Sequence, residues 1–207
     1  MFNIFSKKIP DKVLDTSILI DGRILDLIQT GFLEGRLIVP KFVLYELQQV
    51  ADSNDLLKRK RGKRGLMILD EIKKIAPILV WERESDESKA VEEVDTKLVI
   101  LCKEQGAKLL TVDYNLNKVA KVQDVSVLNV NELNTALRVP LIMGESFWIR
   151  VIKKGEQKGQ GIGYLDDGTM VVIDNAGDNI GDRMKVFVRG INQTQSARIV
   201  FAKQYSE

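Results

Sequence analysis

The sequence AKLLTVD at residues 107–113 is a short apolar run that ends in an acid, and KVLD at residues 12–15 has the same form. Short apolar runs of this kind are typical of strands buried on both faces, as in parallel sheets. Asp15 and Asp113 are then expected at the carboxyl ends of two such strands. Open α/β sheets bind their ligands at that edge, so these two acids mark the first place to look for a site.

Outward from these strands, residues 11–138 alternate between predicted strands and helices. Further strands are expected at 36–39, 78–81 and 125–130, and helices at 22–30, 40–50, 64–76, 88–105, 116–122 and 132–138. Such alternation predicts a parallel sheet with helices on both faces.

The pattern changes at Val139-Pro140. Five extended runs follow, at residues 147–152, 161–165, 169–173, 184–188 and 198–202, and Asp166-Asp167-Gly168 reads as a tight hairpin turn. Five short strands predict a small all-β barrel of the OB-like kind, an architecture often used for oligonucleotides. The sequence therefore predicts a tail at 1–10, an α/β domain at 11–138, a linker at 139–145 and a β domain at 146–203.

Composition excludes several kinds of chemistry. Among 207 residues there is no histidine, which removes imidazole bases and histidine-ligated metals, and a single cysteine, Cys102, which excludes an intrachain disulfide and a cysteine metal site. The net charge of +2 is too small to indicate nucleic acid by itself. No apolar stretch approaches the ~18 residues of a membrane span, so we expect a cytoplasmic protein, although the soluble part of a membrane-anchored parent would look the same.

Two more acids are expected near the strand-end pair. Asp95 and Glu46 lie beside the apolar stripes of their predicted helices. Each acid alone can be a helix cap, a surface acid or half of an ion pair, and Asp15 precedes Thr16 and Ser17 at a possible helix start. As a set of oxygen donors they favour a hard cation, Mg²⁺ or Mn²⁺, and such ions chiefly serve phosphate chemistry. Asp21 is close enough in sequence to Asp15 to be a peripheral ligand.

The order of these motifs resembles the PIN nuclease domain: VLDTS at 13–17, YEL at 45–47, VD at 94–95 and LTVDYNL at 110–116. The segment GQGIGYLDDGTMVV at 159–172 resembles the TRAM domain. Together the two resemblances cover residues 11–203 and look like the bacterial PIN plus TRAM proteins, several of which also carry an N-terminal membrane region that we do not find here.

The resemblance implies a metal-dependent ribonuclease. It implies one or two Mg²⁺ or Mn²⁺ ions held by Asp15, Glu46, Asp95 and Asp113, with hydroxyl support from Ser17 and Thr111. It further implies in-line attack of water on the phosphodiester, leaving a 5′-phosphate and a 3′-hydroxyl, self-association, and no small-molecule cofactor.

Cations are concentrated at residues 58–64, where six occur in seven positions: Lys58, Arg59, Lys60, Arg61, Lys63 and Arg64. A solvated, mobile loop is one interpretation. Because the run follows the helix of Glu46, it can also form a rim of the acidic pocket and hold an RNA strand by its phosphates.

The second domain offers further cations for phosphates: Lys153, Lys154, Lys158, Arg183, Lys185 and Arg189. Phe147, Trp148 and Tyr164 are available for stacking on bases, although alternation predicts that some of them belong to the core. Gly159, Gly161 and Gly163 alternate along a strand and are expected to relieve crowding in the barrel. The TRAM resemblance implies RNA, and single-stranded RNA is the form most open to such contacts.

Four functions remain open at this point. The first is a ribonuclease, with endonucleolytic cleavage of single-stranded RNA, and the second a non-catalytic RNA-binding or regulatory module with a vestigial acidic pocket. The third uses the basic run for DNA. The fourth, hydrolysis by paired carboxylates as in glycosidases, fits the acid count but not the neighbouring polycation and barrel.

Overall fold

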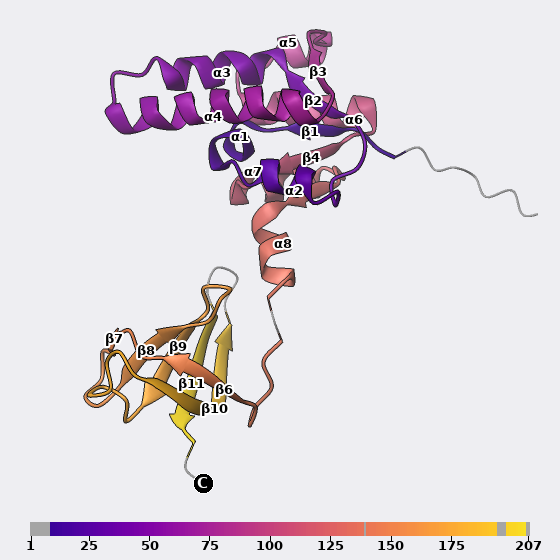
Figure 1. Cartoon of the computed structure of the whole chain (residues 1–207). Helices are drawn as coiled ribbons and strands as arrows, with labels where there is room; N and C mark the ends of the chain where they lie inside the picture. Colours follow the sequence, from indigo (N-terminus) through magenta and orange to yellow (C-terminus); the bar gives the residue numbers. More distant parts are fainter. Residues whose placement is uncertain (1–8, 139, 194–197, 206–207) are drawn as a thin grey trace, which may run out of the picture. The chain divides into compact units, whose positions relative to one another are not determined.

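The structure, a computed structural model, describes residues 9–138, 140–193 and 198–205 (Figure 1). The chain divides into two compact units, with the boundary between Ala136 and Leu137. Most of the predicted tail at 1–10, and Val139 at the start of the predicted linker, lie outside the described residues. The predicted limits 11–138, 139–145 and 146–203 stay predictions, and Arg138 belongs to the second unit.

The first unit follows the predicted alternation of strands and helices. Its strands are β1 (Lys12–Leu14), β2 (Leu37–Pro40), β3 (Ile78–Trp81), β4 (Lys108–Thr111) and β5 (Val127–Asn129). Its helices are α1 (Thr16–Asp21), α2 (Ile24–Gln29), α3 (Lys41–Ala51), α4 (Leu56–Ile75), α5 (Asp86–Lys89), α6 (Val94–Gln105), α7 (Tyr114–Val122) and α8 (Val130–Ala136). All pairings are parallel, and the strand order is β3-β2-β1-β4-β5, which confirms the predicted α/β sheet.

This order has a reversal at its centre. The chain runs outward from β1 through β2 to β3, then crosses to β4 and continues outward to β5. Because crossover connections are right-handed, the connections on either side of the reversal cover opposite faces of the sheet. The carboxyl ends of the neighbouring strands β1 and β4 therefore mark the topological switch point, where open α/β sheets bind ligands.

The structure adds one helix to those predicted and splits another. The helix expected at 22–30 is α2 alone, and the chain already makes α1 before it, which ends at Gly22 with φ +87°. The helix expected at 88–105 is split into α5 and α6 by an irregular stretch at 90–93. Asp95 therefore lies in the first turn of α6 and not in the middle of a long helix.

The basic run at 58–64 is helical, so the loop interpretation is wrong. It forms part of α4, whose N-terminus is capped by the Asp55 carboxylate accepting from the backbone N–H groups of Leu57 and Lys58 at 2.7 and 2.9 Å. Two glycines let α4 approach its neighbours closely. A Cβ at Gly62 would lie 2.3 Å from the backbone nitrogen of Ala51 in α3, and one at Gly65 would lie 2.7 Å from the Leu47 side chain.

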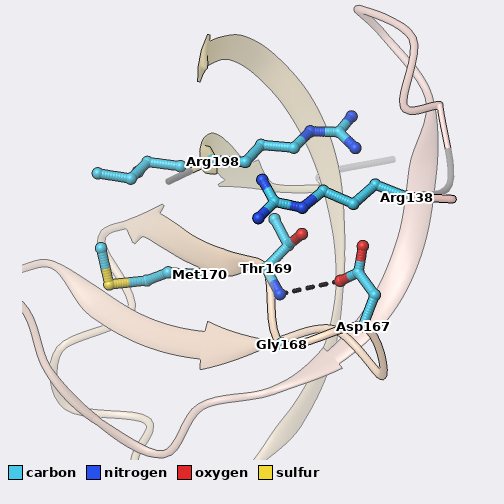
Figure 2. Close-up of a pocket in the computed structure, with 7 residues that line it drawn as sticks. Arg138, Asp167, Gly168, Thr169, Met170 and Arg198 are labelled. Carbon is cyan, nitrogen blue, oxygen red and sulfur yellow. Dashed lines mark hydrogen bonds between the residues drawn. The ribbon is translucent and has the colours of Figure 1, made fainter. Parts of the chain in front are cut away.

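The second unit is a six-stranded sheet of order β6-β10-β11-β9-β8-β7, with one parallel pairing, β11 with β9, among antiparallel ones. Its strands are β6 (Ser146–Arg150), β7 (Lys153–Lys154), β8 (Gly161–Tyr164), β9 (Met170–Asp174), β10 (Arg183–Gln193) and β11 (Arg198–Gln204). The predicted hairpin turn joins β8 to β9, where Gly168 has φ +80° and Asp167 accepts from the Thr169 backbone N–H at 2.9 Å (Figure 2).

The glycines of β8 face the interior of this sheet. A Cβ at Gly161 would lie 2.7 Å from the Ala176 carbonyl oxygen, and one at Gly163 would lie 2.6 Å from the Arg150 carbonyl oxygen. These two glycines relieve crowding, as expected. Gly159 lies outside the strand with φ +85° and more open surroundings.

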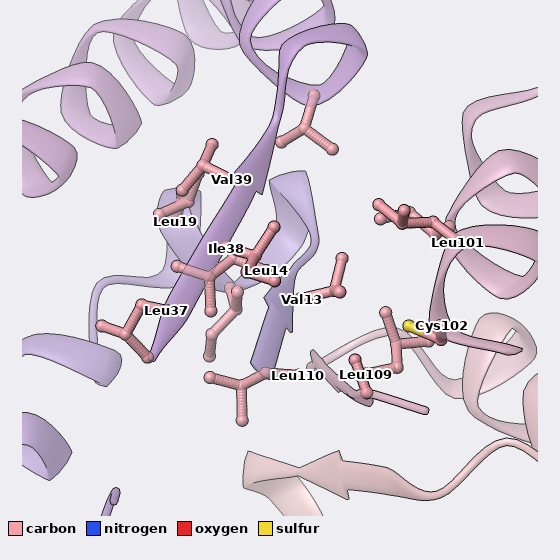
Figure 3. Close-up of a cluster of buried hydrophobic side chains, with 14 of the residues drawn as sticks. Val13, Leu14, Leu19, Leu37, Ile38, Val39, Leu101, Cys102, Leu109 and Leu110 are labelled. Atoms are coloured by element: carbon pink, nitrogen blue, oxygen red, sulfur yellow. The ribbon is translucent and has the colours of Figure 1, made fainter. Parts of the chain in front are cut away.

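Each unit has its own hydrophobic core. The first core gathers β1, β2 and β4 with α1, α3, α4 and α6, and Figure 3 shows Val13 and Leu14 of β1 among residues of β2, β4 and α6. The second core lies among β6, β9, β10 and β11. The fully buried, near-continuous apolar character of β1 and β2 is what a sheet covered on both faces requires.

The close approach of α4 to α3 predicts the effect of filling Gly62. In an unconstrained helix, Gly→Ala raises stability by roughly 1 kcal/mol. At Gly62 the added methyl group meets backbone, so we expect Gly62→Ala to lower the free energy of unfolding by about 1–3 kcal/mol. The measurement is urea unfolding with Lys60→Ala, an exposed position of the same helix, as the control. A stability equal to or above that of the parent would contradict the packing.

Candidate active site

Asp15 is a buried carboxylate at the end of β1. Its side chain is 4% exposed and occupies the N-cap position of α1 without capping it. Its Oδ2 accepts from the Thr111 hydroxyl at 2.7 Å and from the Ser17 hydroxyl, and these two hydroxyls are 3.1 Å apart. Burial raises the pKa of Asp15, while the hydrogen bonds from Ser17 and Thr111 oppose that rise. The acid thereby joins β1, α1 and β4.

Asp113 follows β4 on the same edge of the sheet. Its Oδ1 caps α7 by accepting from the backbone N–H groups of Asn115 and Leu116 at 2.7 and 2.9 Å. Its own N–H donates to the Thr111 hydroxyl at 2.9 Å. Thr111 therefore bridges the two strand-end acids, since it accepts from Asp113 and donates to Asp15.

Glu46 reaches the same region from α3. Its Oε2 accepts from the hydroxyl of Thr16, the residue next to Asp15. Thr16 is buried at the start of α1, and this contact fixes the Glu46 side chain beside the end of β1.

The pKa of Asp95 reflects the burial of its carboxyl and the charges of the other three acids. Its pKa is raised from 3.8 to about 6, first by burial of the carboxyl among neighbouring atoms and then by the charges of Asp15, Asp113 and Glu46. Asp95 is nevertheless accessible to solvent on one side. The charges of the other three acids therefore act on the Asp95 carboxyl, and the four acids form one negatively charged set near the carboxyl ends of β1 and β4. We call this set (Asp15, Glu46, Asp95 and Asp113) the acidic pocket.

The chemistry of the acidic pocket suits a hard divalent cation, because all its donors are carboxylate oxygens. Within residues 9–138, 140–193 and 198–205, however, no three acidic side chains stand close enough together to hold an ion as they are placed. Asp95 and Asp113 are both exposed, and the Asp113 carboxylate is held by the backbone N–H groups that it caps. Ligation of one ion by the whole set therefore requires side chains of the set to move from these positions.

Asp21 is paired with Arg23, outside the set of four acids. Its carboxylate forms an ion pair with Arg23, at 2.6 and 2.9 Å, and Arg64 donates to its backbone oxygen at 2.9 Å. Burial alone would raise the pKa of Asp21, but the bonds from Arg23 hold it below its usual value. Asp21 as a peripheral ligand stays a prediction, and in that role its carboxylate would have to exchange Arg23 for the ion.

The cations of the basic run lie on the first half of α4. Arg59 is half-buried, and the exposed members are Lys58, Lys60, Arg61, Lys63 and Arg64. The contact of Arg64 with Asp21 brings this part of α4 against the end of α1, the helix that begins beside Asp15. The first half of α4 is therefore a cationic surface on the same unit as the acidic pocket.

The predicted cations of the second unit are exposed except for Lys185, which is half-buried, and some have partners. Lys154 pairs with Asp178 at 3.4 Å, Arg189 pairs with Asp174 at 3.3 Å, and Arg183 lies over the Trp148 ring at 6.0 Å. Lys153 and Lys158 are exposed as well.

Two arginines of the second unit were missed from the sequence. Arg138 and Arg198 line a cavity of about 260 Å³ together with Asp167 and Thr169 (Figure 2). Burial tends to raise the pKa of Asp167, but the Thr169 hydrogen bonds and the two arginines hold it below its usual value. Arg138 and Arg198 are 60 residues apart, and nothing in the local pattern around either one signals their meeting.

Comparison with known proteins identifies both units. A family model of the PIN domain matches residues 12–122, more than half of the chain, and a model of the TRAM domain matches residues 143–198. The chain belongs to the PIN domain family. A TRAM domain follows the PIN domain, so the family expected from the sequence motifs is confirmed.

Relatives carry the same pair of domains. The uncharacterized PIN and TRAM-domain containing protein YacL of Bacillus subtilis (strain 168) is 49% identical over 192 residues, covering 93% of this chain and 52% of that protein. The corresponding protein slr1972 of Synechocystis is 47% identical over 199 residues, covering 95% and 55%. This chain spans about half the length of these relatives.

A solved domain of a functionally unknown protein from Methanocaldococcus jannaschii overlays with a TM-score of 0.49 at 24% identity, covering 66% of this chain and 97% of that one. A likeness of that degree adds nothing to the assignment. Among the described residues of the PIN and TRAM units, no helix has the length and apolar character needed to cross a membrane.

The electrostatics of the acidic pocket predict a stability effect. A carboxyl whose pKa is higher in the folded state favours folding at low pH, and this contribution is lost as the pH rises through about 6. At pH 7.5 in EDTA, Asp95→Asn therefore raises the melting temperature. Because Asp95 is exposed, we expect a gain below roughly 1 kcal/mol, or up to about 3 °C.

The control for this prediction is Asp26→Asn, an exposed acid in the first turn of α2. Thermal unfolding at pH 7.5 and pH 4.5 makes the comparison. The Asp95→Asn gain should shrink at pH 4.5, whereas an equal gain at both pH values, or in both variants, would mean that repulsion within the pocket is not its cause.

Proposed function

We propose that this protein is a metal-dependent endoribonuclease that hydrolyses single-stranded RNA at the acidic pocket of its PIN unit. The observation that carries the proposal is that Thr111 donates to Asp15 and accepts from the N–H of Asp113 at one edge of the sheet. Thr16, the residue next to Asp15, donates to Glu46 at the same edge. Four carboxylates from separate parts of the chain are costly to gather, and their meeting place is the switch point of the sheet.

The residues that would hold one or two Mg²⁺ or Mn²⁺ ions are Asp15, Glu46, Asp95 and Asp113. When bound, a divalent ion supplies the Lewis acidity and positive charge that phosphodiester hydrolysis needs. The hydroxyls of Ser17 and Thr111 orient the Asp15 carboxylate, and the Thr16 hydroxyl orients Glu46. Orientation by neighbouring groups of this kind is usual around metal ligands.

The cationic half of α4 would hold the RNA backbone near this pocket. Its exposed lysines and arginines contact phosphates without reading the bases. The TRAM unit supports the same substrate, because its surface carries further exposed cations.

A second function is favoured by one observation. Since no three acids of the described chain stand at metal-holding distances, a non-catalytic RNA-binding module is the alternative. It predicts metal-independent RNA binding and no cleavage with any divalent ion.

The nuclease proposal predicts the following result. The parent protein cuts a labelled, unstructured RNA in Mg²⁺ or Mn²⁺ and leaves 5′-phosphate ends, and Asp95→Asn lowers the cleavage rate at least about 100-fold, as expected for loss of a group in the reacting site. Asp26→Asn, the exposed acid on α2, retains the parent rate. End-group analysis on a sequencing gel makes the measurement.

Two outcomes would count against the nuclease. Cleavage at equal rates by the parent and by Asp95→Asn would place the activity elsewhere or in a contaminant. Retained RNA binding without cleavage in either metal would leave the RNA-binding module as the function.

The role of α4 is tested by salt dependence. Each phosphate contact on a single strand contributes about 0.7 to the slope of log K against log salt. Replacing both Lys60 and Lys63 by alanine should weaken binding and reduce the slope by roughly 1.4. Lys73→Ala, on the second half of α4, is the control, and an unchanged slope in the double variant would remove α4 from the RNA path.

A further inference from the structure

The outward face of the TRAM sheet carries aromatic and basic side chains together. Along β11 the inward positions Val200 and Ala202 are buried, and the alternating outward positions are Ile199, Phe201 and Lys203, with Tyr205 next in the alternation just after the strand. Phe201 is 40% exposed and Tyr205 is 44% exposed. Rings that are left half in solvent contribute little to the TRAM core, so folding alone does not explain them.

Strand register extends this face across β10 to β6. Lys185 lies opposite Trp148, and the Tyr205 backbone N–H donates to the Lys185 carbonyl oxygen at 2.9 Å. Residues directly opposite in neighbouring strands project from the same face. Trp148, which is 58% exposed, Lys185 and Tyr205 therefore form a row across three strands.

Two cations make cation–π contacts with the aromatic rings of this row. The Lys185 ammonium lies 4.5 Å from the centroid of the Tyr205 ring, and the Arg183 guanidinium lies 6.0 Å from the centroid of the Trp148 ring. Each ring thus has a positive group beside it, an arrangement that also attracts phosphate.

A groove continues the same face toward the other edge of the sheet. It has a volume of about 420 Å³, and its apolar floor is formed by outward residues of β8, β9 and β11: Ile162, Met170, Val172, Ile199 and Phe201. Lys153 and Lys154 of β7 and the segment 155–157 line its rim. Apolar surface bordered by lysines suits a ligand that has flat apolar groups and negative charge.

Cations outnumber acids on this face. Asp174 projects from β9 but pairs with Arg189 and lies opposite Lys203, and Glu156 is at the rim of the groove. The unopposed charge is therefore positive, which disfavours a basic partner. A duplex is disfavoured for a different reason, because its bases are stacked on one another and cannot lie on protein rings.

We propose that this face is a stacking platform for single-stranded RNA. Bases stack on Trp148, Tyr205 and Phe201, while Arg183, Lys185 and Lys153 contact the phosphates between them. Phe201 lies on β11 and Tyr205 directly follows the end of that strand, four residues further on. In an extended chain this is about 13 Å, so the two rings receive different bases. The platform rests on the proposed function for its ligand, but it does not depend on cleavage.

The experiment measures binding in EDTA, where metal-dependent cleavage is absent. A fluorescein-labelled 12-nucleotide oligouridylate is compared with a 12-nucleotide abasic RNA strand, which has the same phosphates and no bases. We expect the full chain to bind the abasic strand at least about 10-fold more weakly, because base stacking is lost. Equal affinities would overturn the proposal, and so would preference for an RNA duplex or for DNA alone.

Variants locate the platform. Phe201→Ala and Tyr205→Ala should each weaken oligouridylate binding by about 5–100-fold and leave abasic binding unchanged, while Tyr205→Phe should restore it. The control is Ile180→Ala, which removes an apolar side chain that is 50% exposed and does not line the groove. Aromatic variants that behave like Ile180→Ala, with melting temperatures equal to that of the parent, would overturn the proposal.

The fluorescence of Trp148 provides an independent measurement of binding to the platform. The chain has two tryptophans, so Trp81→Phe leaves Trp148 as the sole tryptophan. Oligouridylate should quench its fluorescence and the abasic strand should not. If oligouridylate binds the platform but RNA is not cut in Mg²⁺ or Mn²⁺, the nuclease proposal is refuted and the platform is supported. If RNA is cut but Phe201→Ala and Tyr205→Ala leave binding unchanged, the platform is refuted and the nuclease proposal is supported.

Discussion

The burial of Asp15 at the end of β1 is the constraint on which the PIN unit is organised. A carboxylate removed from water must find donors, and here they are hydroxyls from α1 and β4. Each hydrogen bond to a charged group contributes roughly 1.5–3 kcal/mol net. The donors fix β1 against β4 at their carboxyl ends, and the same threonine then positions Asp113. The acidic pocket is thus part of how the sheet is held together at its switch point.

The basic run shows where local sequence reasoning fails. Six cations in seven residues, with a glycine among them, are typical of a loop, and like charges at helical spacing cost about 0.2–0.5 kcal/mol per pair. Two effects outweigh that cost. Asp55 caps the helix, and Gly62 and Gly65 allow α4 to pack on α3 at backbone distance. The Ser-Asn-Asp stretch at 53–55 is the signal of a helix start, whereas the packing role of the glycines appears only with the neighbouring helix in place.

Other parts of the fold could be predicted because their signals are local. Apolar runs located the strands of the parallel sheet, and the turn at 166–168 located the hairpin of the TRAM unit. The acids of the pocket were selected by their position at strand ends and on helix faces, and by resemblance. The hydrogen bonds of these acids could not be predicted, and neither could the row of Trp148, Lys185 and Tyr205. Alternation along a strand tells which face a side chain is on, but the register between strands distant in sequence decides which side chains meet.

The placement of positive charge follows from the negative pocket. The net charge of +2 is small although the PIN unit carries both a set of four carboxylates and the cationic first half of α4. A lysine or arginine inside the pocket would neutralise a carboxylate, as Arg23 does to Asp21, and would take the place of a metal ion. Cations outside the pocket leave the acids available. An RNA strand is repelled by four carboxylates until their charge is compensated, so a site of this kind needs cations that stand outside the acid set, as those on the first half of α4 do, if it is to hold a polyanion.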